Sequence, residues 1–138
     1  MTVSVAEAEK ILEQSFAPWV RALDIRVDIM GTDRATLSIP ITDQIARVGG
    51  IVSGQAQATL ADTSMVFACF AHLGAPLPVA TTNLDTQFLR PGTGERLRCE
   101  AHVVRAGKAL IFARADLLTA PGDKLVAQAT ATFFKPQV

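Results

Sequence analysis

The chain carries a single acidic side chain, Asp62, in the middle of its most apolar stretch. This stretch, from about Ser53 to Leu73, is rich in Ala, Leu, Met, Val and Phe, and it predicts a helix buried on most sides. Burying a carboxylate without partners is costly, so Asp62 must pair, take up a proton or perform chemistry. Asp62 is therefore a candidate nucleophile or general base. The alternative is a structural Asp that is hydrogen-bonded to a neighbouring Thr or Ser.

A glycine-containing segment runs directly into this predicted helix, with the sequence Gly49-Gly50-Ile51-Val52-Ser53-Gly54-Gln55. Helix N-termini present free N–H groups and a partial positive charge. Such a terminus can hold a developing oxyanion, and a glycine at position 54 lets a ligand carbonyl approach the backbone closely. The alternative is that these glycines only shape a turn.

The separation of Gly54 and Asp62 bears on how many chains form the site. Eight positions on a helix correspond to about 12 Å, whereas catalytic contacts need a reach of about 3 Å. Two such helices lying antiparallel across a two-fold axis would place each Gly54 near the partner's Asp62. If both residues serve one reaction, the sequence predicts a homodimer.

The spacing of apolar residues predicts the elements that must position these groups. Ser4 and Glu7 match a capping box that opens a first helix, and Pro18 disturbs that helix. The long apolar helix stops at Gly74 and Pro76. Alternating apolar residues predict strands, which cover 25–29, 35–39, 84–88, 96–103, the stretch between turns at Gly107 and 121–123, and 127–133; residues 40–50 are expected to form a loop.

This order of elements indicates the architecture. The last three strands follow one another through short turns, which is typical of an antiparallel meander. Only a strongly curved sheet can cover an apolar helix on several sides. The sequence therefore predicts an α+β fold, with an antiparallel sheet wrapped around one long central helix. The length of 138 residues favours a single domain over residues 1–138.

Composition excludes several classes of protein. Thirteen basic and thirteen acidic side chains cancel, which argues against a nucleic-acid binder and against an electrostatic membrane anchor. No apolar run is long enough to span a bilayer. The two cysteines, Cys69 and Cys99, and the two histidines, His72 and His102, form no metal-ligand spacing. We therefore expect no metal, and a reduced, cytoplasmic setting.

Two motifs resemble those of a known family. The run from Ser53 to Thr63 resembles the signature of the PaaI-like thioesterases of the hotdog superfamily, in which His-Gly-Gly precedes the catalytic Asp of a Leu-Ala-Asp-Thr-Ala segment. Asp62 lies nine positions after Ser53, the same offset as from the family's His. The run Thr82-Asn-Leu-Asp-Thr-Gln-Phe-Leu-Arg-Pro-Gly92 resembles the family's Thr-x-x-x-x-x-Phe-Leu-Arg-Pro strand. The resemblance spans roughly Val48 to Phe134.

This resemblance implies the hotdog fold and the hydrolysis of acyl-coenzyme A (acyl-CoA) thioesters without a cofactor, coenzyme A being part of the substrate. We expect the substrate to be a small or medium acyl- or aryl-CoA, which is split into the free acid and coenzyme A. It implies that Asp62 is the nucleophile or general base. It also implies that the Gly54 N–H of the other chain polarises the thioester carbonyl. The family consists of homodimers, often paired into tetramers.

The resemblance also suggests residues that bind the substrate. Thr82, next to Asn83, would line the pocket and orient the attacking water. Apart from the resemblance, Arg47 and Arg90 are candidates to meet the phosphates of coenzyme A, since guanidinium suits that geometry; the simpler interpretation is that each is a surface or interface residue.

The chain departs from the family pattern at two positions of the motif. Ser53 replaces the His and Gln55 replaces the second Gly. Ser53 can still hydrogen-bond the substrate carbonyl, and Gln55 can contribute an amide contact or restrict the approach.

Other readings of the same residues remain open. The substitutions at 53 and 55 favour an alternative in which the protein binds acyl-CoA without chemistry, as a binding or regulatory protein. An enoyl-CoA hydratase of the same fold would need a paired Asp and His in its loop, and the loop has no His. A triad of Ser64, His72 and Asp62 lacks the glycines of a nucleophile elbow.

Overall fold

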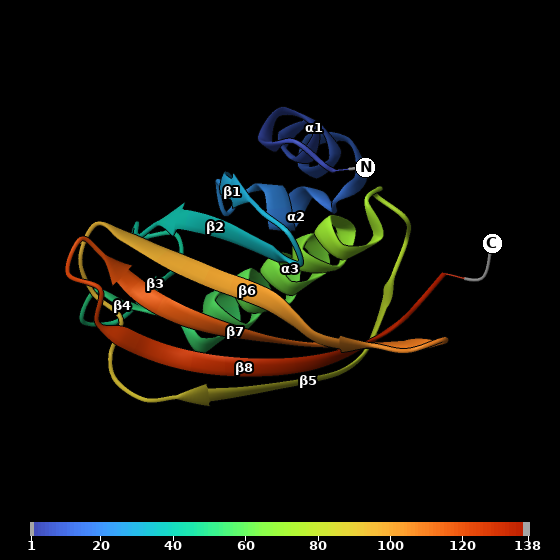
Figure 1. Cartoon of the computed structure of the whole chain (residues 1–138). Helices are drawn as coiled ribbons and strands as arrows, with labels where there is room; N and C mark the ends of the chain where they lie inside the picture. Colours follow the sequence, from blue (N-terminus) through green and yellow to red (C-terminus); the bar gives the residue numbers. More distant parts are fainter. Residues whose placement is uncertain (1, 137–138) are drawn as a thin grey trace.

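A computed structural model describes residues 2–136 and shows helices on one side of a curved sheet (Figure 1). In chain order the elements are α1 (Val5–Ser15), α2 (Pro18–Arg21), β1 (Arg26–Met30), β2 (Arg34–Pro40), β3 (Ala46–Arg47), β4 (Ile51–Val52), α3 (Gly54–Leu73), β5 (Ala80–Phe88), β6 (Arg96–Ala106), β7 (Leu110–Ala120) and β8 (Leu125–Phe134).

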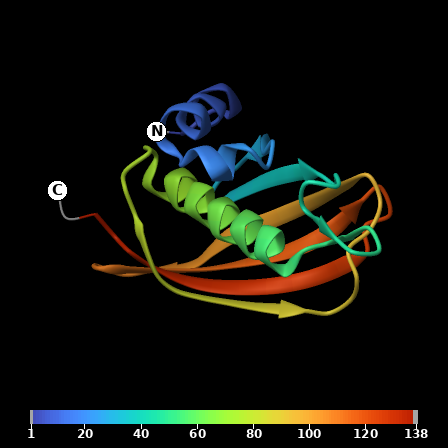
Figure 2. The same cartoon turned by 180° about the vertical axis from the view of Figure 1, so that it is seen from behind.

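The central helix α3 forms as the sequence predicts. Ser53 caps its first turn, and Gly74 ends it in the left-handed conformation (φ 74°) that favours glycine. Most of its side chains are buried, including Leu60, Met65 and Phe67. The helix packs mainly on β2, β6 and β7. Seen from behind, α3 lies across the concave face of the sheet (Figure 2).

The sheet has six antiparallel strands in the order β1-β2-β6-β7-β8-β5. The consecutive strands β6, β7 and β8 form the predicted meander, and inward-facing residues such as Leu97, Ile111 and Phe133 are fully buried. The α+β hotdog arrangement predicted from the sequence is confirmed. In the part of the chain that the structure describes, no helix is both long and apolar enough to cross a membrane.

The N-terminal segment forms two helices rather than one disturbed helix. The capping box of Ser4 and Glu7 is present at α1. The helix ends at Ser15, and Pro18 then opens α2, since proline fits the first helical position. Glu9 accepts a hydrogen bond from the Val27 N–H at 2.8 Å, which ties α1 to β1. Phe16 stacks on Phe67 of α3, with ring centroids 5.5 Å apart.

The segment 40–50, expected to be a loop, contains part of a short hairpin. Strands β3 and β4 pair through Arg47 and Ile51. Gly49 and Gly50 have φ values of 96° and 73°, which other residues rarely adopt. The turn therefore depends on the Gly-Gly pair, and strands of two residues are too short to show a periodic pattern.

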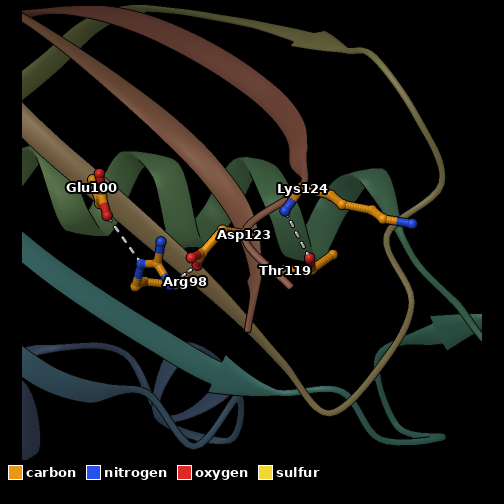
Figure 3. Close-up of polar contacts among 5 residues, drawn as sticks. All are labelled: Arg98, Glu100, Thr119, Asp123 and Lys124. Carbon is orange, nitrogen blue, oxygen red and sulfur yellow. Dashed lines mark hydrogen bonds and ion pairs between the residues drawn. The ribbon is translucent and has the colours of Figure 1, made fainter. Parts of the chain in front are cut away.

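Polar contacts hold the turn that joins β7 to β8 (Figure 3). Arg98 on β6 contacts Asp123 at 2.8 Å, and its Nε contacts Glu100 at 3.0 Å. The Thr119 hydroxyl accepts a hydrogen bond from the Lys124 N–H at 3.0 Å. The predicted turn at 121–123 is thus linked to both β6 and β7.

Strand β5 is an edge of the sheet, and it is exposed on both faces. Eight of its nine residues are exposed and only Thr86 is partly covered. Leu84 and Phe88 expose 38% and 54% of their surface. Their alternation with Asn83, Asp85 and Gln87, visible in the sequence, does not bury one face of the strand in this single chain.

Candidate active site

Asp62 lies in the middle of α3 and is half-buried. Its carboxylate accepts a hydrogen bond from the Thr81 hydroxyl at 2.8 Å. Burial raises the pKa of Asp62 above its ordinary value, and the Thr81 hydrogen bond partly offsets that rise. The carboxylate is thus oriented by one donor and only partly solvated, as suits a nucleophile or general base.

A cavity of about 200 Å³ adjoins Asp62. Its walls come from the N-terminal segment, from one face of α3 and from β5, and its lining residues are Phe16, Trp19, Val20, Ala58, Thr59, Asp62, Thr63, Val66 and Leu84. Asp62 supplies the only charge in this lining. The carboxylate therefore faces a space suited to an apolar group.

A second cavity, of about 400 Å³, lies at the N-terminus of α3. It brings together the predicted residues Arg47, Gly54 and Arg90, along with Gln57 and Phe88. A Cβ added at Gly54 would lie 3.3 Å from the Phe88 ring, so the glycine keeps the start of the helix open. The two guanidinium groups and the helix N-terminus make this end attractive to a negatively charged or carbonyl-bearing ligand.

Ser53 acts as the helix cap in this structure. Its hydroxyl accepts the Ala56 N–H at 3.2 Å, and its own N–H donates to the Ile45 carbonyl at 3.0 Å. The cap leaves the N–H groups of Gly54 and Gln55, the first two of the helix, to other acceptors. The Gln55 side chain is exposed and does not line either cavity.

The structure places Thr81, rather than Thr82, against Asp62. The register of β5 with β8 shifts between Thr81 and Asn83. Thr82 donates its hydroxyl hydrogen to the Thr132 carbonyl at 3.1 Å, and Asn83 is exposed and lines neither cavity. Thr81 was missed because a strand irregularity leaves no pattern in the sequence.

Gln57 is a second residue that sequence reasoning missed. Its side chain is only 4% exposed, and its Nε2 donates to the Val52 carbonyl at 3.1 Å. Its Oε1 is buried without a hydrogen-bond partner. The signal that singled out Asp62, a polar residue in an apolar helix, was present here as well.

The alternative triad of Ser64, His72 and Asp62 does not form. Ser64 is fully buried, and His72 contacts Asp33 through Nδ1 at 2.9 Å, so Ser64, His72 and Asp62 make no triad.

Burial, together with the charge of Asp62, raises the pKa of the Cys69 thiol to about 12. Cys69 and Cys99 are buried and unpaired, as expected for core residues. Within residues 2–136 no cluster of three or more His, Cys, Asp or Glu side chains could hold a metal ion.

Gly54 and Asp62 belong to separate cavities in one chain. The two cavities share no lining residue, and the helical rise separates the two residues by about 12 Å. One chain thus presents two distinct cavities, one with a helix N-terminus and arginines, the other with a carboxylate and an otherwise largely apolar lining.

Solved structures with the same fold come from bacteria and a vertebrate. A thioesterase family protein from Silicibacter pomeroyi is 25% identical, with a TM-score of 0.81 over 92% of this chain and 93% of that one. Zebra fish thioesterase superfamily member 2 is 22% identical, with a TM-score of 0.84 over 96% and 99%. The Escherichia coli PaaI protein from the phenylacetic acid degradation operon is 23% identical, with a TM-score of 0.82 over 94% and 91%. No curated protein matches the sequence.

The family comparison agrees with this fold. The thioesterase superfamily model matches residues 49–126, more than half of the chain, and this span contains both Gly54 and Asp62. The chain therefore belongs to the thioesterase superfamily, and it shares its hotdog fold with the PaaI protein.

Proposed function

We propose that this protein hydrolyses acyl-CoA thioesters and that Asp62 is its catalytic carboxylate. The observation that carries the proposal is the half-buried Asp62, oriented by Thr81 at 2.8 Å and facing an apolar cavity. A carboxylate held in this way can attack a carbonyl carbon or take a proton from water. Membership of the thioesterase superfamily supports the reaction class.

In the proposed reaction, the thioester carbonyl oxygen accepts hydrogen bonds from the N-terminus of α3, where Gly54 admits it. Charge that develops on this oxygen is stabilised there. Asp62 takes a proton from a water molecule whose oxygen bonds to the carbonyl carbon, or it attacks that carbon itself. The carbon–sulfur bond then breaks, and coenzyme A leaves as a thiolate. Where Asp62 is the nucleophile, this leaves the acyl group on Asp62 as a mixed anhydride, and a water molecule then cleaves it to give the free acid and the Asp62 carboxylate. Arg47 and Arg90, beside Gly54, would pair with its phosphates.

We further propose that the complete site forms between two copies of the chain. The exposed edge strand β5 offers unpaired backbone groups to a second copy. Leu84 lies at the Asp62 cavity and Phe88 at the Gly54 cavity. These two residues are about 13 Å apart along the strand, close to the Gly54–Asp62 separation. A two-fold axis between them would bring each Gly54 to the partner's Asp62, and such dimers could pair into tetramers.

The first experiment is thiol release from a panel of acyl-CoAs, short and long aliphatic plus phenylacetyl and benzoyl, by the wild type and Asp62→Asn. We expect the variant to lose about 10²–10⁴-fold in kcat/KM, the usual contribution of a general base. A wild-type dimer that binds these thioesters and hydrolyses none would contradict the proposal and favour the acyl-CoA-binding alternative.

We also propose that the protein is cytoplasmic, because its two cysteines are unpaired and a reduced setting keeps thiols in that form.

A further inference from the structure

Trp19 is an exposed aromatic residue at the edge of the Asp62 cavity. It lies on the short helix α2, exposes 64% of its surface and is the only tryptophan in the chain. Large aromatic side chains bury 150–250 Å² when they are covered, and they dominate the energetics of binding sites. An exposed tryptophan beside a partly buried carboxylate therefore marks a surface that an apolar group can cover.

The cavity walls are built from fixed elements. On α3, Ala58, Asp62 and Val66 recur every four residues and so share one face of the helix. On the opposite side, Phe16 is held by its stacking contact with Phe67, and Trp19 follows three residues later. The carboxylate thus forms part of one wall, and aromatic rings form another.

The position of Asp62 determines which part of a thioester enters this cavity. The reacting carbonyl must lie within about 3 Å of the carboxylate or of its water. Arg47 and Arg90 line the Gly54 cavity, which the second copy of the chain would bring to Asp62 in the proposed dimer. Their positive charge therefore directs the coenzyme A portion to that cavity. The acyl portion, on the other side of the carbonyl carbon, is left to the apolar cavity.

We propose that the Asp62 cavity binds the acyl group and that Trp19 determines the preference for longer aliphatic acyl groups over acetyl. This inference rests on the proposed hydrolysis. The cavity has a volume of about 200 Å³, and Trp19 at its edge is 64% exposed. An acetyl group leaves most of this space unfilled, whereas a longer aliphatic chain can fill it and cover the Trp19 ring.

The first test compares kcat/KM for acetyl-, hexanoyl-, octanoyl- and palmitoyl-CoA in the wild type, Trp19→Ala and Val104→Ala. Val104 is the matched control, because it is also a mostly exposed apolar residue (58%) but lines a different cavity. We expect Trp19→Ala to lower the hexanoyl-to-acetyl ratio about tenfold, the size of effect that one lost apolar contact has on specificity. Val104→Ala should leave the ratio unchanged.

The second test needs no turnover, since the single tryptophan is its own reporter. S-hexyl-coenzyme A, a thioether that cannot be hydrolysed, should shift Trp19 emission to shorter wavelength, whereas coenzyme A alone should not. Hydrolysis with the same chain-length profile in wild type and Trp19→Ala, and no emission shift, would overturn the inference and leave the proposed function intact.

The remaining outcomes separate the two proposals. An absence of hydrolysis together with a thioether-induced shift would remove the proposed function and keep the acyl cavity. An emission shift that follows protein dilution but not the thioether would show that a second copy of the chain covers Trp19, and it would overturn the inference.

Discussion

At the scale of single residues, Asp62 combines a cost in stability with the role in chemistry that we propose for it. Burial raises its pKa in the folded protein, so the stability of the fold is greatest when the carboxyl is protonated. That contribution is fully present below the ordinary pKa of 3.8 and is lost as the pH rises through the folded value. The ionised form of Asp62 therefore destabilises the fold, a cost that the proposed catalytic role would explain.

We accordingly expect Asp62→Asn to be more stable than the wild type at pH 7. Asparagine is neutral at every pH and can still accept the Thr81 hydrogen bond. The difference in free energy of unfolding, measured by denaturant titration, should narrow as the pH falls toward 4. A variant that is equally stable or less stable at pH 7 would contradict the assignment of burial as the dominant cause of the raised pKa.

Thr81 and Thr82 provide a matched pair of variants for the pH dependence of the reaction. The Thr81 hydroxyl lowers the pKa of Asp62, so Thr81→Val should raise that pKa. Because the reaction needs the ionised carboxylate, the acid limb of kcat/KM should move to higher pH. Thr82→Val removes only a hydrogen bond to the Thr132 carbonyl, and its acid limb should stay in place. Equal shifts in both variants would refute a specific contact with Thr81.

At the scale of elements, the sequence predicted the helices and strands whose residues follow a local periodicity. The run from Ser53 to Leu73 predicted α3 because its apolar composition and the stop at Gly74 are properties of the local sequence. The contact of Thr81 with Asp62 depends instead on a register shift in β5, which arises from pairing with β8. The role proposed for Trp19 depends on α2 lying beside the same cavity as residues of α3. Such tertiary placements leave no periodic signal.

At the start of α3, the substitution Gly54→Ala should lower activity without lowering stability. Gly54 does not have a left-handed φ, so Gly54→Ala keeps the backbone, and its added Cβ meets only the Phe88 ring at 3.3 Å, which is itself half exposed. We expect little change in melting temperature. We also expect a loss of about 10²-fold in kcat/KM, because the added methyl group keeps the thioester carbonyl away from the N–H groups of the helix N-terminus, with an effect similar to that of removing one oxyanion donor. Gly107→Ala, where a Cβ would lie 3.7 Å from the Leu110 carbonyl, is the control.

The cause of that loss can be checked by adding Phe88→Ala to Gly54→Ala. If the methyl group itself occupies the approach to the helix N-terminus, removing the ring restores nothing. Recovery of kcat/KM in the double variant would show instead that Gly54→Ala acts by displacing Phe88, and it would remove Gly54 from the proposed oxyanion site.

At the scale of the whole molecule, one chain holds two separate cavities along α3, and β5 is one of the two edge strands of its sheet. Gly54 and Asp62 lie in cavities that share no residue, although they come from the same helix. The edge strand β5 borders both cavities through Leu84 and Phe88. A two-fold axis at this strand would pair the exposed edge and complete both sites at once, whereas association through any other edge would leave them incomplete.

Mixing inactive variants tests this geometry directly. Asp62→Asn and Gly54→Ala homodimers each carry two defective sites. A mixed dimer would carry one site with both substitutions and one with neither. Random exchange of equal amounts makes half of the dimers mixed, so the mixture should recover about one quarter of wild-type activity. The two homodimers, assayed without exchange, are the control. If each site lies within one chain, every site in the mixture carries a substitution, and no activity returns even though size-exclusion chromatography shows dimers.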